Sequence, residues 1–274
     1  MSILRRTPVI AFLIGVTAGV FGGLVGLGGG VVMVPLLTAW ARLTQHEAHA
    51  TSLAGVVATG IAGAFTYASE GAVDWRSALL LAAVSVFATY IAAHRSQDVP
   101  ADRLRRFFGW FLIVAACLLV FKDEMLSLRA PQGAWSLVFL LVTGLFVGVA
   151  SGLLGVGGGA LMVPLLVIGL GMAQHIAQGT SLAAMVPAGA AGTVAHVRNR
   201  SVRFDAVLGL VPGITAGTWV GGRLALGLPG STLRLVFALV LVMLGARYLK
   251  RSGSGERRRR RHRAEAEAAR GPHT

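Results

Sequence analysis

The chain has 274 residues, of which 55% are hydrophobic and 13% are charged, and its formal net charge is +14. A soluble domain carries about 25% charged residues, so this chain has too few charges to cover a water-facing surface. The mean hydropathy of +0.71 agrees with this conclusion. The apolar residues fall in runs of about 17–20, the length of helix that spans about 30 Å of hydrocarbon. The sequence therefore predicts an all-α polytopic membrane protein.

The first apolar run follows Arg5 and Arg6 and begins at Pro8. Such a start is also compatible with a secretory signal peptide. No A-x-A cleavage site follows the run, and a matching run at residues 137–155 lies inside the chain, where it cannot be a signal. We therefore expect the first run to remain as a membrane segment.

In chain order, each half contains a long apolar run, a Gly-rich break, a short apolar run and three full-length runs. In the first half, the expected segments are 8–25, 31–41, 50–68, 77–94 and 104–121. In the second half, they are 137–154, 160–170, 180–196, 205–223 and 232–249. A short run of 11 residues forms a helix of about 16 Å, which cannot cross a bilayer alone. We expect these short runs to be half-spans that are buried within the protein or re-entrant.

The two halves are copies of one unit. Residues 15–37 and 144–166 are identical at 14 of 23 positions without gaps, at an offset of 129. The same offset superposes Thr51-Ser52-Leu53 on Thr180-Ser181-Leu182 and Pro100 on Pro229. The sequence therefore predicts an internal duplication, with a first membrane repeat at 1–125 and a second at 126–250.

Loop charge bears on the orientation of the repeats. If the short run completes a crossing, each repeat has five segments, and the two repeats are inverted. With the N-terminus inside, the inside loops are 42–49, 95–103, 197–204 and the C-terminal segment, which hold most of the arginines. The outside loops are 69–76, 122–136, 171–179 and 224–231, where the few bases are offset by acids. The positive-inside bias favours this arrangement, with both termini in the cytoplasm. If the short run only dips into the membrane, the repeats are parallel, and the loops 95–103 and 197–204 fall on opposite sides.

The last segment, 251–274, holds eight arginines, five of them consecutive at 257–261. We interpret it as a disordered, Arg-rich cytoplasmic tail that fixes the topology and contacts anionic lipid. A nucleic-acid role is the alternative. No aromatic residue is interleaved with these charges, so we expect no nucleic-acid partner.

Two glycine triplets interrupt the membrane segments, and each is followed by the sequence M-V-P. They are Gly28, Gly29 and Gly30 before Pro35, and Gly157, Gly158 and Gly159 before Pro164. Glycine frees the backbone from the helix, and a broken helix at membrane depth is tolerated only where it lines a cavity or is buried in protein. The exposed N–H groups beside the next half-helix can bind an anion. Close helix packing is the alternative, and it fits the spacing of Gly15, Gly19 and Gly23 better than the triplets.

The pairs Thr51-Ser52 and Thr180-Ser181 each open an expected apolar run. Their hydroxyl groups can cap a helix, and they can also coordinate an oxyanion. All Asp and Glu residues lie in loops, tails or segment ends, so a carboxylate proton relay is unsupported. We expect no metal, no cofactor and no enzymatic activity, because the spans contain neither a metal-ligand cluster nor a Ser–His–Asp set.

The doubled motif G-x-G-G-G-x-x-x-V-P-L-L, at 26–37 and 155–166, is followed in each copy by A-T-S-L or G-T-S-L. This pattern resembles the TauE/SafE family of sulfite and sulfonate exporters, over nearly the whole chain to about residue 250. The resemblance implies a multi-pass transporter of small inorganic or organosulfur anions in the bacterial inner (plasma) membrane. It also implies that the glycine triplets, Pro35, Pro164 and the two Thr-Ser pairs form the substrate path. An uncoupled anion channel with the same path, or a membrane-embedded assembly factor, is the alternative function.

Overall fold

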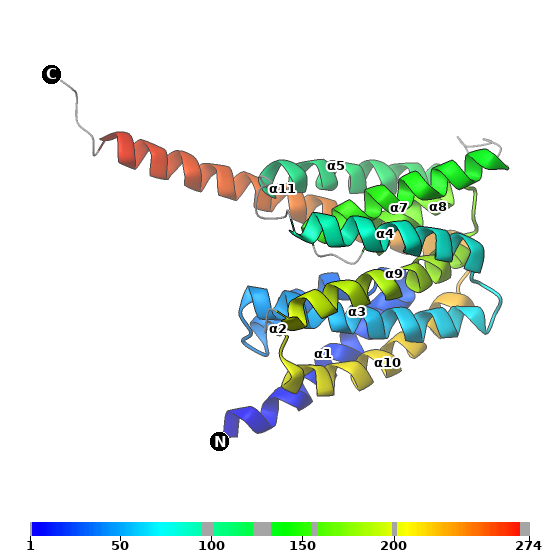
Figure 1. The fold of residues 1–274 in the computed structure, drawn as a ribbon, viewed down its shortest axis with the longest axis horizontal. Coiled ribbons are helices and arrows are strands. Elements are labelled where there is room, and N and C mark those ends of the chain that lie inside the picture. The colour runs from blue at the N-terminus through cyan, green and yellow to red at the C-terminus, as the bar shows by residue number, and fades with distance from the viewer. Residues whose placement is uncertain (1, 95–100, 123–132, 155–157, 199–201, 269–274) are drawn as a thin grey trace.

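The computed structural model describes residues 2–94, 101–122, 133–154, 158–198 and 202–268. Within these ranges the chain forms ten helices and no strand (Figure 1). The helices of the first repeat are α1 (Ser2–Val25), α2 (Gly30–Ala39), α3 (Gln45–Ala68), α4 (Trp75–His94) and α5 (Ala101–Val120). Those of the second are α7 (Ala134–Leu154), α8 (Gly159–Gly169), α9 (Gln174–Arg198), α10 (Phe204–Gly227) and α11 (Gly230–Ala268). The predicted all-helical class is confirmed.

Six of the described helices, α1, α3, α4, α7, α10 and α11, are long and apolar enough to cross a membrane. The predicted short helices are also present, since α2 has 10 residues and α8 has 11. The helix α9 reaches spanning length with 25 residues but carries buried polar side chains such as Gln178 and Thr180, and it is not among the six. The chain is therefore a multi-pass membrane protein with two half-length helices.

Two helices begin five to six residues earlier than the apolar runs predicted. The helix α3 starts at Gln45 rather than at residue 50, and α9 starts at Gln174 rather than at residue 180. The start of α3 is fixed by a capping box, in which the Thr44 hydroxyl accepts from the Glu47 N–H and the Glu47 carboxylate accepts from the Thr44 N–H. Hydrophobicity alone misplaced both helix starts because their first turns are polar.

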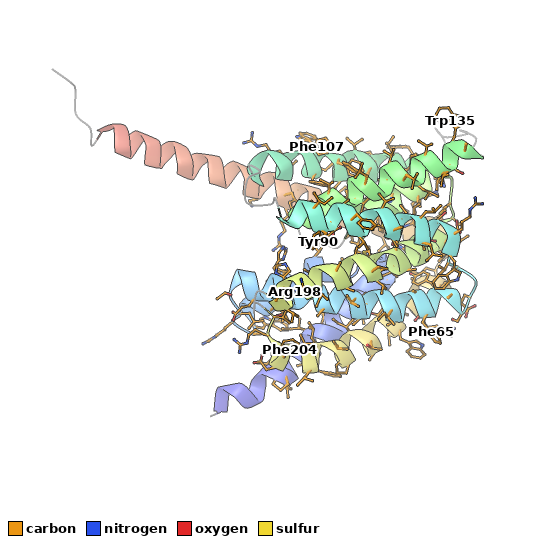
Figure 2. All side chains as sticks on the ribbon, viewed as in Figure 1. Phe65, Tyr90, Phe107, Trp135, Arg198 and Phe204 are labelled. Carbon is orange, nitrogen blue, oxygen red and sulfur yellow. The ribbon has the colours of Figure 1, made fainter. Side chains whose placement is uncertain are left out.

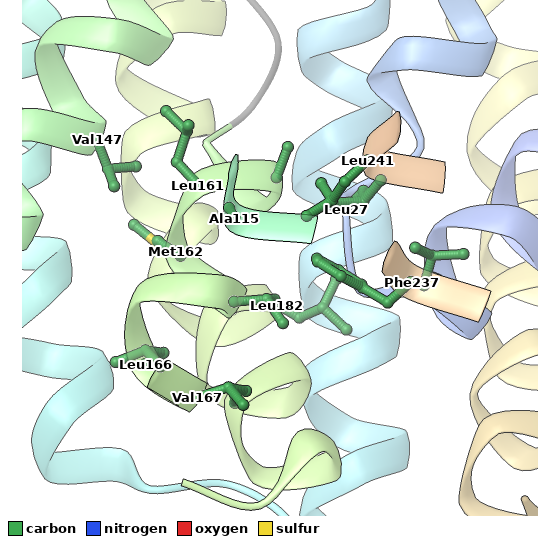
Figure 3. Packing of buried hydrophobic residues seen from close by; sticks show 14 of the residues in the cluster. Leu27, Ala115, Val147, Leu161, Met162, Leu166, Val167, Leu182, Phe237 and Leu241 are labelled. Atoms are coloured by element: carbon green, nitrogen blue, oxygen red, sulfur yellow. The ribbon is translucent and has the colours of Figure 1, made fainter. Parts of the chain in front are cut away.

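The helices pack in two groups that mix the two repeats (Figure 1). The helices α1, α2, α3 and α10 surround one buried apolar cluster, which includes Ile14 and Met33. The helices α4, α7, α8 and α9, with α5 and α11 against them, share a larger cluster that includes Leu161 and Phe237 (Figure 3). The two groups meet where α3 lies along α9. The second half of the chain therefore contributes α10 to the first group, and the first half contributes α4 and α5 to the second group.

The contact between α1 and α10 is built on glycine. A Cβ atom at Gly15 or Gly19 would lie 2.5 Å from the carbonyl oxygen of Leu210 or Ile214, respectively. From the other side, a Cβ at Gly217 would overlap the carbonyl oxygen of Val16. The two backbones therefore touch directly, as predicted for small residues at spacing four. We call this contact the glycine seam.

Ion pairs join α3 to α10 at both of their ends. Arg203 Nη1 lies 3.3 Å from Glu47 Oε1 at the start of the two helices, and Arg223 Nη1 lies 2.8 Å from Glu70 Oε1 at their far ends. These side chains are partly exposed, so each pair contributes about 0–1 kcal/mol to stability. The pairs define the relative register of α3 and α10 more than they stabilise the fold.

The last helix extends beyond the final apolar run. The helix α11 continues from the last span to Ala268, through most of the Arg-rich segment. Residues 269–274 lie outside the described part of the chain. The physical reason is composition, since residues 256–268 contain only Arg, Glu, Ala and His, and the first three favour helix.

Candidate functional site

The first glycine break separates α1 from α2 by four residues. Gly26, Gly28 and Gly29 adopt φ values of 73°, 78° and 69°. This left-handed region is open to glycine at little cost, which explains the glycine cluster. Gly29 is the N-cap of α2, and it offers no side chain to the first N–H groups of that helix. The Val32 and Met33 N–H groups donate to the Gly29 carbonyl oxygen, so the donors left for a ligand are those of Gly30 and Val31.

The second break has the same form where it is described. Gly158 has φ of 71° and is the N-cap of α8, again without a side-chain cap. Gly157 lies outside the described residues. The two breaks are in contact, because a Cβ atom on Gly159 would lie 2.8 Å from the carbonyl oxygen of Gly26. The uncapped start of α8 therefore lies against the first break, four residues before α2 begins.

The two prolines lie farther along the half-helices. Pro35 and Pro164 are each five residues after the first residue of their helix, about 7.5 Å along its axis. Pro164 is fully buried, and the Pro35 carbonyl oxygen accepts from the Thr38 hydroxyl. The structure therefore places the prolines behind the breaks rather than at them.

The Thr-Ser pairs lie inside their helices, so their expected role as helix caps is wrong. Thr51 and Thr180 are fully buried, and each accepts a hydrogen bond from a loop N–H group. Thr51 Oγ1 accepts from the Arg203 N–H at 3.2 Å, and Thr180 Oγ1 accepts from the Asp74 N–H at 2.9 Å. These two partners are themselves 129 residues apart. Equivalent threonines therefore hold the chain at the starts of α10 and α4.

This contact predicts the effect of changing Thr180. The substitution Thr180→Val keeps the shape and removes the acceptor of the Asp74 N–H, so we expect a loss of about 1–3 kcal/mol in stability. The substitution Thr180→Ser retains the oxygen and is expected to stay near the wild-type value. Melting temperatures of the purified variants in detergent check this. Equal melting temperatures for the valine and serine variants would contradict the structural role.

The two serines make different contacts. Ser52 Oγ donates to the carbonyl oxygen of His49 at 2.8 Å, within its own helix. Ser181 Oγ lies 2.9 Å from the Gln178 carbonyl oxygen and 3.2 Å from the Gly26 carbonyl oxygen. Ser181 therefore joins α9 to the first break. Of the predicted site residues, Gly159 and Ser181 come together at the carbonyl oxygen of Gly26, in the break that contains Gly28 and Gly29.

Sequence reasoning missed two polar residues beside the first break. The Tyr67 hydroxyl lies 2.9 Å from the Gly23 carbonyl oxygen and 2.9 Å from Gln178 Oε1, and its one proton serves one of these acceptors at a time. A Cβ atom on Gly26 would lie 2.8 Å from Gln178 Cγ. Tyr67 and Gln178 are both fully buried. They connect α3 and α9 to the end of α1.

A signal for Gln178 was present in the sequence. The capping pattern Thr44-x-x-Glu47 marks the start of α3, and the repeat offset carries that start to about residue 174. With α9 beginning there, Gln174 and Gln178 lie one turn apart on one helix face. When the start of α3 is not transferred to the second half in this way, both glutamines fall in the expected loop 171–179.

Comparisons with known proteins agree with this architecture. The family described as "Sulfite exporter TauE/SafE" matches residues 11–264. The chain belongs to the TauE/SafE family. Relatives include the probable membrane transporter protein YunE of Bacillus subtilis (strain 168), which is 27% identical over 88% of this chain and 97% of its own length. A probable membrane transporter protein of Xylella fastidiosa (strain Temecula1 / ATCC 700964) is 29% identical over 88% of this chain and 92% of its own length. No solved structure matches. The resemblance read from the doubled glycine motif is thus confirmed, and this TauE/SafE protein is a membrane transporter.

Proposed function

We propose that this protein is a secondary transporter that exports small oxyanions, of the sulfite or sulfonate class, across the bacterial inner membrane. The contact between the two breaks carries the proposal. There, α2 and α8 begin without side-chain caps, and Gly159 lies against Gly26. Helix N-termini and left-handed glycine backbone both direct N–H groups at a ligand. Such donors hold an anion without a countercharge, which leaves it free to depart.

The proposal includes inverted repeats, with both termini in the cytoplasm. Helix directions support the inversion. Phe65, near the end of α3, lies at the opposite end of the bundle from Arg198, near the end of the equivalent α9 (Figure 2). Likewise, α1 and α7 begin at opposite ends, as the N-terminus and Trp135 indicate (Figures 1 and 2). The start of α1 and the end of α11 lie at the end of the molecule that holds Arg198, where the Arg-rich loops predict the cytoplasm (Figures 1 and 2).

We further propose which parts move. Alternating access requires two rigid bodies that rock about a central site. The packing supports bodies that differ from the sequence repeats, namely α1–α3 with α10 and α7–α9 with α4. The glycine seam and the ion pairs at both ends of α3 and α10 make the first body rigid. Movement then occurs along α3 and α9, beside the breaks.

Flux through proteoliposomes tests this function. Liposomes that contain the purified protein are expected to take up sulfite, and to show lower rates with thiosulfate or sulfoacetate if the site is selective. Liposomes without protein are the control. Saturable counterflow is expected for a carrier. Single-channel currents without counterflow would show that the protein is an anion channel instead of a carrier. The proposal would be contradicted if none of the three anions is transported and if deletion of the gene leaves cellular sulfite resistance unchanged.

A further inference from the structure

Two glutamines on α9 stand out among the buried polar side chains. Gln178 is fully buried and Gln174 is 5% exposed. Within the described part of the chain, Gln178 Nε2 and both amide atoms of Gln174 lack a hydrogen-bond partner. An apolar side chain of similar size would avoid the cost of burying these atoms. Buried polar atoms that have no partner in the chain call for one from outside it, either water or a ligand.

The position of Gln178 shows where such a ligand would lie. Its side chain runs against Gly26, within the break whose backbone leads into the uncapped start of α2. Gly159, at the uncapped start of α8, touches the same Gly26 carbonyl oxygen. The unpartnered amide and the uncapped start of α8 therefore lie together at Gly26, in the break that leads to α2.

Tyr67 bears on the orientation of the amide. When the Tyr67 hydroxyl donates to Gln178 Oε1, 2.9 Å away, the oxygen side of the amide is turned toward α3. The NH₂ group is then the donor without a partner. Such a donor, beside the uncapped start of α8, fits an anion with several oxygen atoms.

We propose that Gln178 is a substrate-binding residue whose amide NH₂ donates to the transported oxyanion, and that Tyr67 positions that amide. This inference rests on the proposed function. It deepens that function by naming a side chain that adds selectivity to the backbone donors. Gln174 is the first residue of α9, one turn farther from the Arg198 end, and lies on the same face as Gln178, so an exported anion would meet it after Gln178.

The test measures sulfite counterflow by the full-length protein in liposomes. Gln178→Leu is expected to raise the KM about tenfold or more, the loss typical of one hydrogen bond to a charged group. Its melting temperature is expected to stay at or above the wild-type value, because an unpartnered buried amide has been removed. Sulfite is expected to raise the melting temperature of the wild type but not that of this variant.

Thr218→Val is the matched control. Thr218 is also fully buried, and its hydroxyl oxygen also lacks a partner in the described chain, but it lies in the glycine seam. Its removal is expected to leave the KM unchanged. Tyr67→Phe is expected to raise the KM with little change in kcat, because it frees the amide to rotate; a fall in kcat alone would contradict the positioning role.

The outcomes separate the two proposals. If the wild type shows counterflow and Gln178→Leu has the same KM, only the proposed role of Gln178 is overturned, and the proposed function stands. Absence of counterflow by the wild type overturns the proposed function and this inference with it. If the leucine variant does not fold, Gln178→Met, which is unbranched like glutamine, takes its place with the same expected and contradicting results.

Discussion

Replacing Gly217 by alanine is expected to cost about 1–3 kcal/mol of stability and to lower the melting temperature by about 5–10 °C. The added Cβ atom would overlap the carbonyl oxygen of Val16 and lie 2.9 Å from the amide nitrogen of Val20. Both atoms belong to the backbone of α1, so no side chain can move away to make room. The two helices must separate, and the glycine seam loses contact along its length.

The same helix provides the control for this change. Gly227 is the last residue of α10, and a Cβ atom there would meet nothing within 4 Å. Alanine is the better helix former, so Gly227→Ala is expected to be neutral or to stabilise by up to ~1 kcal/mol. The comparison is made by heating both variants in detergent and monitoring their unfolding by size-exclusion chromatography. A melting temperature for Gly217→Ala equal to that of Gly227→Ala would show that the seam is loose.

Gly26→Ala is expected to reduce transport at least tenfold while the protein still folds. Gly26 has φ of 73°, which costs alanine about 1–2 kcal/mol. The new Cβ would lie 2.8 Å from Cγ and 2.9 Å from Cβ of Gln178. The substitution therefore displaces the amide and distorts the first break, and a shift of about 1 Å at a binding site is enough for a large loss of activity.

Gly71→Ala separates the backbone strain from the damage to the site. Gly71 has φ of 66°, nearly the same as Gly26, but a Cβ atom there would meet nothing within 4 Å. Gly71→Ala is expected to lose only the stability that the left-handed backbone costs alanine, whereas Gly26→Ala is expected to lose more stability and also sulfite counterflow. Equal transport by the two variants would mean that the first break does not take part in the path.

Much of the fold followed from patterns that are local in sequence. Runs of apolar residues predicted the membrane helices because hydrocarbon requires about 20 such residues for each crossing. The glycine triplets predicted the breaks at residues 26–29 and 158, and the spacing of Gly15, Gly19 and Gly23 predicted a close helix contact. The membrane helices, the breaks and the glycine spacing each depend on residues that are close together in the sequence, which is why the sequence predicted them.

The limits of local pattern appear at Thr51 and Thr180. From sequence they marked helix starts, but their oxygen atoms accept from Arg203 and Asp74, more than 100 residues away. No local rule predicts such a partner, because it depends on which helix packs beside which.

The sequence by itself determined the membrane class, the duplication, the helix breaks and the family, because each depends on composition or on a spacing within one segment. Only the tertiary structure decided that α10 packs with α1–α3, that the two breaks touch, and that Gln178 and Tyr67 lie beside Gly26. These are contacts between distant segments, and they are selected by the packing of whole helix faces rather than by the residues that make them. The two copies of one unit that the sequence revealed thus become two mixed helix groups, with the proposed anion site where they meet.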